Sequence, residues 1–141
     1  MALLTLNVDG ELNQVAPIAV AVRGACAPFL DEEGLDAVEL AVVEAATNVI
    51  RHGYGGRPGG RLSVSVEQVP DGVAVDLVDH AEPMPPRLLE AAEMPLPGDP
   101  DHVAGLAESG WGLALIRLSM DEVSYRPGPD GNWLRMIKRR A

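Results

Sequence analysis

Residues 61–79 alternate apolar and polar side chains on both sides of one tight turn, and this pattern limits the fold most strongly. The apolar positions are Leu62, Val64 and Val66 before the turn, and Val73, Val75 and Leu77 after it. Strict alternation places each series on one face of a β-strand, and Pro70-Asp71-Gly72 is typical of a hairpin turn. The segment therefore predicts an antiparallel pair with one apolar face, which needs a covering layer.

Two helical segments near the N-terminus can supply that layer. Residues 13–30 place apolar side chains at helical spacing, with Asn13 as the expected N-cap. Residues 31–34 are expected to form an acidic turn. A second helix is predicted over about 35–52, ending at Gly53, because glycine commonly follows the last turn of a helix.

The remaining segments complete one domain, 1–141. We expect a strand over 2–8, a helix over about 112–120, and a closing hairpin of strands 122–126 and 133–139. Tight turns favour antiparallel pairing. The order predicts an α+β fold, a two-layer α/β sandwich whose mostly antiparallel, mixed sheet carries helices on one face.

The segment 81–110 breaks this regular pattern. It holds six of the twelve prolines, around one short helical stretch from Arg87 to Glu93. A long loop inside a compact domain is typical of a lid or a binding loop, or else of disorder.

Charge argues against nucleic acid as a direct ligand. The chain has 21 acidic and 11 basic residues, a formal net charge of −10, which repels phosphate backbones. The basic run Arg135, Lys138, Arg139 and Arg140 is interpreted as a solvated edge strand, where charge discourages further pairing.

Cysteine usage and hydropathy predict a cytoplasmic protein that does not enter a membrane. Cys26 is the single cysteine and is expected to be a small core residue, as in a reducing compartment. Asp9 and Glu11 come too early for a signal peptide, and the longest apolar run, 16–22, is far too short to span a bilayer.

Three short segments carry possible chemistry, and the first is on the second helix. Glu44 and Asn48 are four residues apart and therefore share one helix face. A carboxylate beside a carboxamide offers a proton acceptor next to a Mg²⁺ ligand. Taken alone, the pair is more typical of an ordinary polar rim. His52, one turn later, extends this face or interacts favourably with the helix C-terminus.

The second and third segments are Asp79 and Gly110-Trp111-Gly112. Alternation places Asp79 on the core-facing side of its strand, where a buried carboxylate needs a hydrogen-bond donor. The amino group of a nucleotide base or a backbone N–H of the following loop would serve. Glycines before a helix N-terminus can cradle phosphate, although such glycines are also common in ordinary loops. Mg-ATP binding explains all three segments together.

With these residues established, the chain resembles the GHKL (Bergerat-fold) ATPases and, among them, the RsbW-type anti-sigma-factor serine-protein kinases. Residues 39–55 (ELAVVEAATNVIRHGYG) are similar to the N-box of that family. Residues 75–81 (VDLVDHA) occupy the place of its D-x-G adenine box, and residues 109–123 are similar to its glycine box and the segment that follows. The likeness covers almost the whole chain.

The resemblance implies a role for each matching residue. Glu44 would be the general base, Asn48 the Mg²⁺ ligand and Asp79 the acceptor for the adenine amino group. Residues 95–109 would form a lid over ATP. The other nucleotide-contacting positions that the resemblance implies are His52, Ala81, Ser109, Gly110, Gly112 and Leu113.

The resemblance also implies partners and a regulatory function. Such proteins hold a sigma factor inactive, phosphorylate a serine on a STAS-domain antagonist, switch between these partners and are commonly homodimers. The present chain departs from the family at Ala81, where a methyl group replaces the D-x-G glycine. The alternative function is therefore a catalytically weak or inactive module that only sequesters partners. A sensor histidine kinase or a gyrase-like ATPase is not favoured, since neither a dimerisation helix nor a transducer domain is seen.

Overall fold

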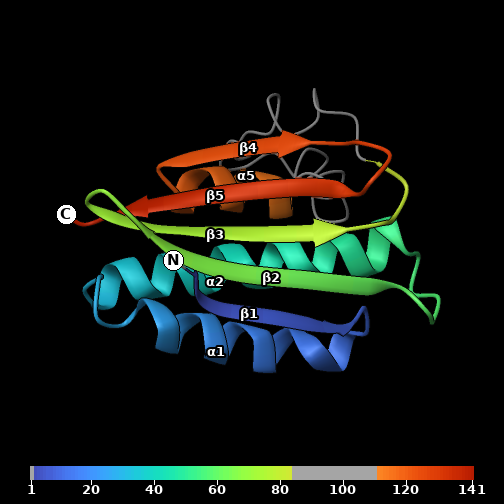
Figure 1. Ribbon diagram of the computed structural model, residues 1–141, viewed down its shortest axis with the longest axis horizontal. Helices are drawn as coiled ribbons and strands as arrows, with labels where there is room; N and C mark the ends of the chain where they lie inside the picture. Colours follow the sequence, from blue (N-terminus) through green and yellow to red (C-terminus); the bar gives the residue numbers. More distant parts are fainter. Residues whose placement is uncertain (1, 84–110) are drawn as a thin grey trace, which may run out of the picture.

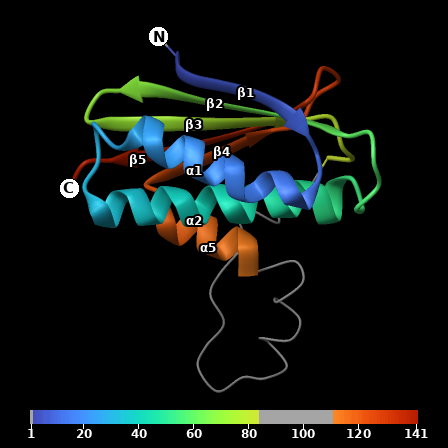
Figure 2. The same cartoon turned by 90° about the horizontal axis from the view of Figure 1, so that it is seen from below.

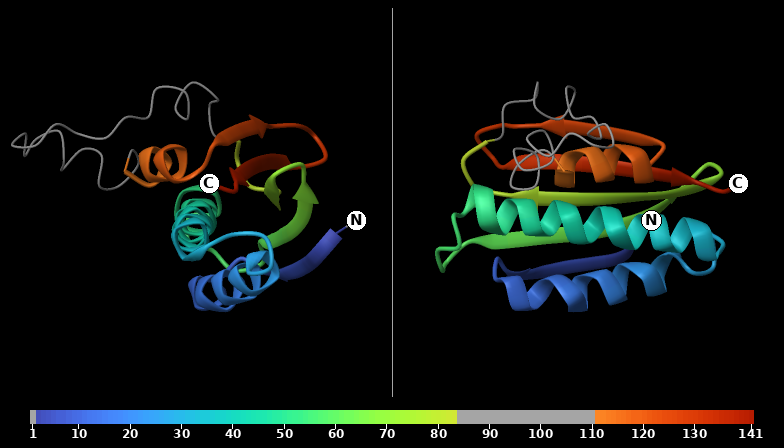
Figure 3. Two further views of the ribbon diagram at one scale, coloured as in Figure 1. Left: turned by 90° about the vertical axis from the view of Figure 1, so that its left-hand side faces the viewer. Right: turned by 180° about the vertical axis from the view of Figure 1, so that it is seen from behind.

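The computed structural model describes residues 2–83 and 111–141, apart from the side chains of 111–113. Within these residues, five antiparallel strands form one sheet in the order β1-β2-β3-β5-β4, and three helices cover one face of it (Figures 1 and 3). The strands are β1 (Ala2–Asp9), β2 (Arg61–Val69), β3 (Gly72–Asp79), β4 (Glu122–Arg126) and β5 (Asn132–Arg139); the helices are α1 (Val15–Cys26), α2 (Glu32–Asn48) and α5 (Trp111–Ser119), with short turns η1 (Leu12–Gln14) and η2 (Val49–Gly53). The predicted α+β two-layer sandwich is confirmed.

The β2–β3 hairpin has the predicted register. Val64 lies opposite Leu77 and Val66 opposite Val75, and all four side chains are fully buried. Asp71 in the turn has φ 63°, a left-handed conformation that Asp tolerates better than most residues. The apolar face of the hairpin packs against α1 and α2, where it forms the centre of the core.

The C-terminal basic run is not on an edge strand, so that interpretation was wrong. β5 pairs with both β3 and β4, and the sheet edges are β1 and β4. Arg135 lies on the face opposite the helices and binds Asp76 and Glu67, with nitrogen–oxygen distances of 2.8 and 2.6 Å. Alternation of apolar and polar residues alone could not distinguish an edge strand from an interior strand. The order of strands in a sheet depends on contacts between segments distant in sequence.

Helix α1 begins and ends at different residues from those predicted. Asn13 does not cap it, because residues 12–14 form the 3₁₀ turn η1, which leads directly into the helix. The helix ends at Cys26 rather than near Leu30. Pro28 has no N–H to donate to the carbonyl of Gly24, and that carbonyl instead accepts a 3.4 Å bond from the Ala27 N–H.

Helix α2 starts earlier than predicted and changes its pitch near its end. The Asp31 side chain accepts a 2.9 Å hydrogen bond from the Gly34 N–H, so the supposed acidic turn is the N-cap and first turn of the helix. Negative side chains there interact favourably with the helix dipole. The α-helix ends at Asn48 rather than near residue 52, and the chain continues as the π-helical turn η2, whose last residue is Gly53.

The core lies between the helices and the sheet (Figure 2). Cys26 is fully buried in it, as predicted. Burial disfavours the thiolate and raises the pKa of the Cys26 thiol to about 11. Across the described residues, the helices are too short or too polar to span a bilayer.

Candidate functional site

Glu44 and Asn48 lie one turn apart near the C-terminal end of α2, and both are half-buried. The amide nitrogen Nδ2 of Asn48 is buried and has no hydrogen-bond partner within residues 2–83 and 111–141. An orphaned buried polar atom is unusual in a folded protein and often marks a binding site. This amide is therefore a suitable candidate for binding a ligand.

Asp79, the last residue of β3, has a side chain at the end of the core. The residue is only 5% exposed, and its Oδ1 accepts two hydrogen bonds of 2.9 Å, from the Ala81 N–H and from Nδ2 of Asn132. A backbone N–H of the following loop, one of the two donors that the sequence allowed for Asp79, is thus present. A carboxylate has about four acceptor sites, so Asp79 can accept a further hydrogen bond from a ligand beside these two.

The end of η2 and the loop after Asp79 are in direct contact. A Cβ atom built on Gly53 would lie 2.7 Å from Cβ of Ala81, closer than real Cβ atoms approach. The methyl group of Ala81 therefore packs against the helix end that follows Asn48. This contact brings the Glu44–Asn48 helix and the Asp79 loop to the same end of the molecule.

His52 lies in η2 and its side chain is exposed. The π-helical turn is wider than an α-helical turn, so residues after Asn48 no longer follow the four-residue spacing from which the shared face was predicted. π-Helical turns of this kind are frequent at functional sites. A role for His52 in nucleotide binding stays a prediction.

Gly112 and Leu113 belong to the first turn of α5. This helix packs beside α2, and Figure 2 shows the two running next to each other under the sheet. Gly112 of the predicted glycine cradle is thus on a helix adjacent to the one with Glu44 and Asn48. Ser109, Gly110, the 95–109 lid and the helical stretch 87–93 lie outside the described residues.

Two residues that the sequence analysis missed complete this region. Asn132, at the start of β5, is 3% exposed, and its Nδ2 donates to Asp79 Oδ1 and to the Ala81 carbonyl, both at 2.9 Å. Tyr54 hydrogen-bonds to His80 and Arg61 through its hydroxyl. No local pattern indicated Asn132, because it lies 53 residues from Asp79 in sequence. The aromatic ring of Tyr54 beside a glycine-rich loop was a signal that could have been used.

The residues present fit ATP with Mg²⁺. In the described residues, no group of three or more His, Cys, Asp or Glu side chains is placed to hold a metal ion by itself. Mg²⁺ is commonly held by one or two protein oxygens, phosphate oxygens and waters. The Asn48 carboxamide provides one hard oxygen, which suits such a site.

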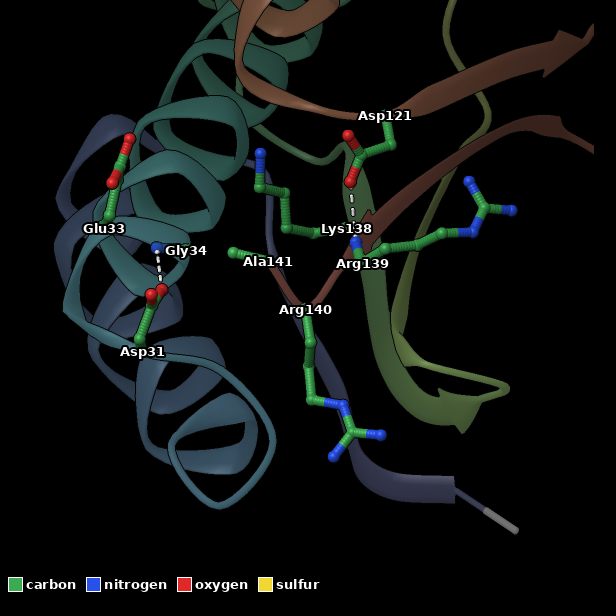
Figure 4. Close-up of a pocket in the computed structure, with 8 residues that line it drawn as sticks. All are labelled: Asp31, Glu33, Gly34, Asp121, Lys138, Arg139, Arg140 and Ala141. Atoms are coloured by element: carbon green, nitrogen blue, oxygen red, sulfur yellow. Dashed lines mark hydrogen bonds between the residues drawn. The ribbon is translucent and has the colours of Figure 1, made fainter.

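A separate groove lies at the other end of α2 (Figure 4). It is lined by Asp31, Glu33, Gly34, Asp121, Lys138, Arg139, Arg140 and Ala141. None of these is a predicted site residue. Its cations already have partners in the protein: Lys138 donates to the Ser119 carbonyl at 2.9 Å, Arg139 pairs with Glu122, and Arg140 approaches Asp71 at 3.6 Å. The cations of the groove therefore each contact another group of the protein.

Comparison with known proteins agrees with this geometry. Residues 8–138 match the family model described as a histidine kinase-like ATPase domain. The chain is 38% identical over 121 residues to an anti-sigma F factor of Geobacillus kaustophilus (85% of this chain, 78% of that protein) and 34% identical over 112 residues to one of Anoxybacillus flavithermus (79% and 72%).

A further relative is the serine-protein kinase RsbW of Oceanobacillus iheyensis, 29% identical over 92 residues. That match covers 64% of this chain and 57% of the relative, so the similar region spans little more than half of the kinase. The family model covers most of the chain. The two anti-sigma F factors are each more than 30% identical to it, over most of this chain and most of their own lengths. The chain therefore belongs to the histidine kinase-like ATPase domain family, in the group that includes RsbW and the anti-sigma F factors.

Proposed function

We propose that the chain is an anti-sigma factor and an ATP-dependent serine kinase, which sequesters a sigma factor and phosphorylates a STAS-domain antagonist in the cytoplasm. The observation that carries the proposal is the contact between Gly53 and Ala81. It joins the helix with Glu44 and Asn48 to the loop after Asp79, as one nucleotide site requires. The names of the relatives support the anti-sigma and kinase roles.

Each site residue has a defined task in this proposal. Bound Mg²⁺ would neutralise phosphate charge, and Asn48 would supply one of its oxygen ligands. Asp79 would accept a hydrogen bond from the adenine amino group. Glu44 would accept the proton of the serine hydroxyl while the serine oxygen forms a bond to the γ-phosphorus. The bond between the γ-phosphorus and the β–γ bridging oxygen would break, and ADP would leave.

The test is phosphorylation of the antagonist by wild type and by Glu44→Ala with Mg-ATP, followed by intact-protein mass spectrometry. Wild type should add one phosphoryl group, and Glu44→Ala should be slower by about 100-fold or more, the usual contribution of a general base. Sigma-factor binding should be unchanged. Glu33→Ala, at the other end of α2, is the matched control and should retain the rate. Undiminished phosphorylation by Glu44→Ala would refute the assigned role.

The alternative is a module that sequesters partners without catalysis, and it is favoured by Ala81. Its methyl group fills space at the junction with Gly53, where the family pattern has glycine. In that case ATP would bind weakly, and the antagonist would remain unmodified in the same mass spectra. Phosphoserine on the antagonist eliminates this alternative.

The sheet edges support a homodimer. Residues 2–8 of the edge strand β1 carry no charge, whereas the other edge, β4, is short and has Glu122 and Arg126 at its ends. Charged residues and short length discourage edge pairing, so β1 is the edge open to a second copy. Sedimentation equilibrium should give the mass of two chains. A monomer at every concentration tested would contradict this part of the proposal.

A further inference from the structure

Tyr54 fits into a slot made by two glycines from different parts of the chain. A Cβ on Gly60 would lie 2.7 Å from atoms of the tyrosine ring, and a Cβ on Gly10 would lie 3.1 Å from it. The Gly10 N–H donates a 2.8 Å hydrogen bond to the Gly60 carbonyl, which joins the two walls of the slot. The absence of side chains at both positions therefore allows the ring to lie against backbone.

The hydroxyl of Tyr54 connects two further segments. It donates a hydrogen bond of 2.6 Å to the carbonyl of Arg61 at the start of β2. It also accepts one of 2.9 Å from the N–H of His80. His80 is the residue between Asp79 and Ala81, so this second bond acts on the candidate adenine-binding segment itself.

Residues 79–81 are thus held from three sides. Tyr54 binds the His80 N–H, Asn132 binds both the Asp79 carboxylate and the Ala81 carbonyl, and Gly53 contacts the Ala81 methyl group. Tyr54 and Gly53 are adjacent in sequence and follow directly from the helix that contains Asn48. The position of the segment is therefore coupled to that helix.

We propose that Tyr54 is a positioning residue that determines selectivity for adenine by fixing residues 79–81 through the His80 N–H. The inference rests on the proposed nucleotide-binding function. Oδ1 of Asp79 already accepts hydrogen bonds from Ala81 and Asn132. The carboxylate retains acceptor capacity, and it is the group that receives the exocyclic amino group of adenine. A shift of the 79–81 backbone moves this carboxylate and weakens that bond, whereas phosphate contacts elsewhere are unaffected.

The experiment compares wild type with Tyr54→Phe, which keeps the ring and removes the hydroxyl. Tyr125→Phe, on β4, is the matched control because the chain has two tyrosines. Isothermal titration calorimetry measures the dissociation constants for Mg-ATP and Mg-GTP, and NMR hydrogen exchange follows the His80 amide. For Tyr54→Phe we expect ATP to bind about three- to tenfold more weakly, GTP binding to stay the same, and the His80 amide to exchange faster.

The outcomes separate this inference from the proposed function. Wild type that binds no ATP contradicts the proposed function. If wild type binds ATP and Tyr54→Phe has the same ratio of the ATP and GTP dissociation constants, the inference alone is overturned. This includes the case in which the substitution weakens the binding of both nucleotides equally. An unprotected His80 amide in wild type also overturns it, and that measurement does not depend on the variant folding.

Discussion

Gly53 and Ala81 meet so closely that a Cβ on the glycine would lie 2.7 Å from the alanine methyl group. These residues belong to different elements, the end of η2 and the loop after β3. One methyl group therefore fits at the junction, and two do not. The D-x-G motif has glycine at position 81, whereas this chain has an alanine there, which faces Gly53.

This relationship predicts compensation between the two positions. Gly53→Ala should lower the free energy of unfolding by about 1–3 kcal/mol, the usual cost of overpacking. Adding Ala81→Gly should recover much of this loss, because it removes the opposing methyl group. Urea denaturation of the two single variants and the double variant measures the coupling. Gly24→Ala is the control, since nothing lies within 4 Å of its Cβ position. Strict additivity of the two changes would contradict the contact.

Asn132 is predicted to stabilise the buried Asp79. Asn132→Ala removes two hydrogen bonds of 2.9 Å and leaves the carboxylate with one donor among the described residues. The free energy of unfolding should fall by about 1–3 kcal/mol, the cost of leaving buried polar groups unsatisfied. Thermal unfolding measures the effect. Asn7→Ala, which changes an exposed side chain on β1, should cost far less. Equal losses for both variants would argue against the buried pair.

Asp31 is predicted to stabilise α2 as its N-cap. Asp31→Ala removes the acceptor for the Gly34 N–H and should cost about 1 kcal/mol. Asp31→Asn keeps a side-chain oxygen and should cost less. Asp36→Ala, further along the same helix, breaks a surface ion pair with Arg23 and should cost about 0.5 kcal/mol or less. Chemical denaturation ranks the three variants, and a larger loss for Asp36→Ala than for Asp31→Ala would contradict the capping role.

Because of Cys26, the free energy of unfolding is predicted to fall as the pH becomes alkaline. Burial raises the pKa of its thiol from 9.0 to about 11, so the folded state favours the protonated form. The resulting stabilisation is present in full below pH 9 and is lost as pH rises from about 9 to 11. It amounts to about 2–3 kcal/mol. Cys26→Ala should lack this component. The difference between the unfolding free energies of wild type and variant, measured from pH 8 to 11, should therefore shrink; a constant difference would show that the thiol is not shielded.

The hairpin and the helices could be predicted because their signals are local. Leu62, Val64 and Val66 alternate along one strand, and Val38, Ala41 and Val42 recur at helical spacing on α2. All six are fully buried. Helix ends were less predictable. The Asp31 cap and the proline that ends α1 depend on single hydrogen bonds, which apolar periodicity does not report.

The residues of the candidate site also fall into those that the sequence indicated and those that it did not. Glu44, Asn48 and Asp79 were identifiable as polar residues beside or within apolar stripes, and their order along the chain matched a known family. Asn132 and Tyr54 were not found. Each acts on residues 79–81 from another segment, and their contacts exist only after the chain has folded.

The sequence by itself determined the elements and the buried faces, and it indicated Glu44, Asn48 and Asp79 as site candidates, because periodicity and residue chemistry are properties of short segments. Tertiary structure decided the strand order, with β5 inside the sheet, and the junction of Gly53 with Ala81. It also decided which donors bind Asp79. These features depend on contacts between segments distant along the chain. One methyl group decides whether two segments can pack together, and one amide N–H decides whether a buried acceptor has a donor.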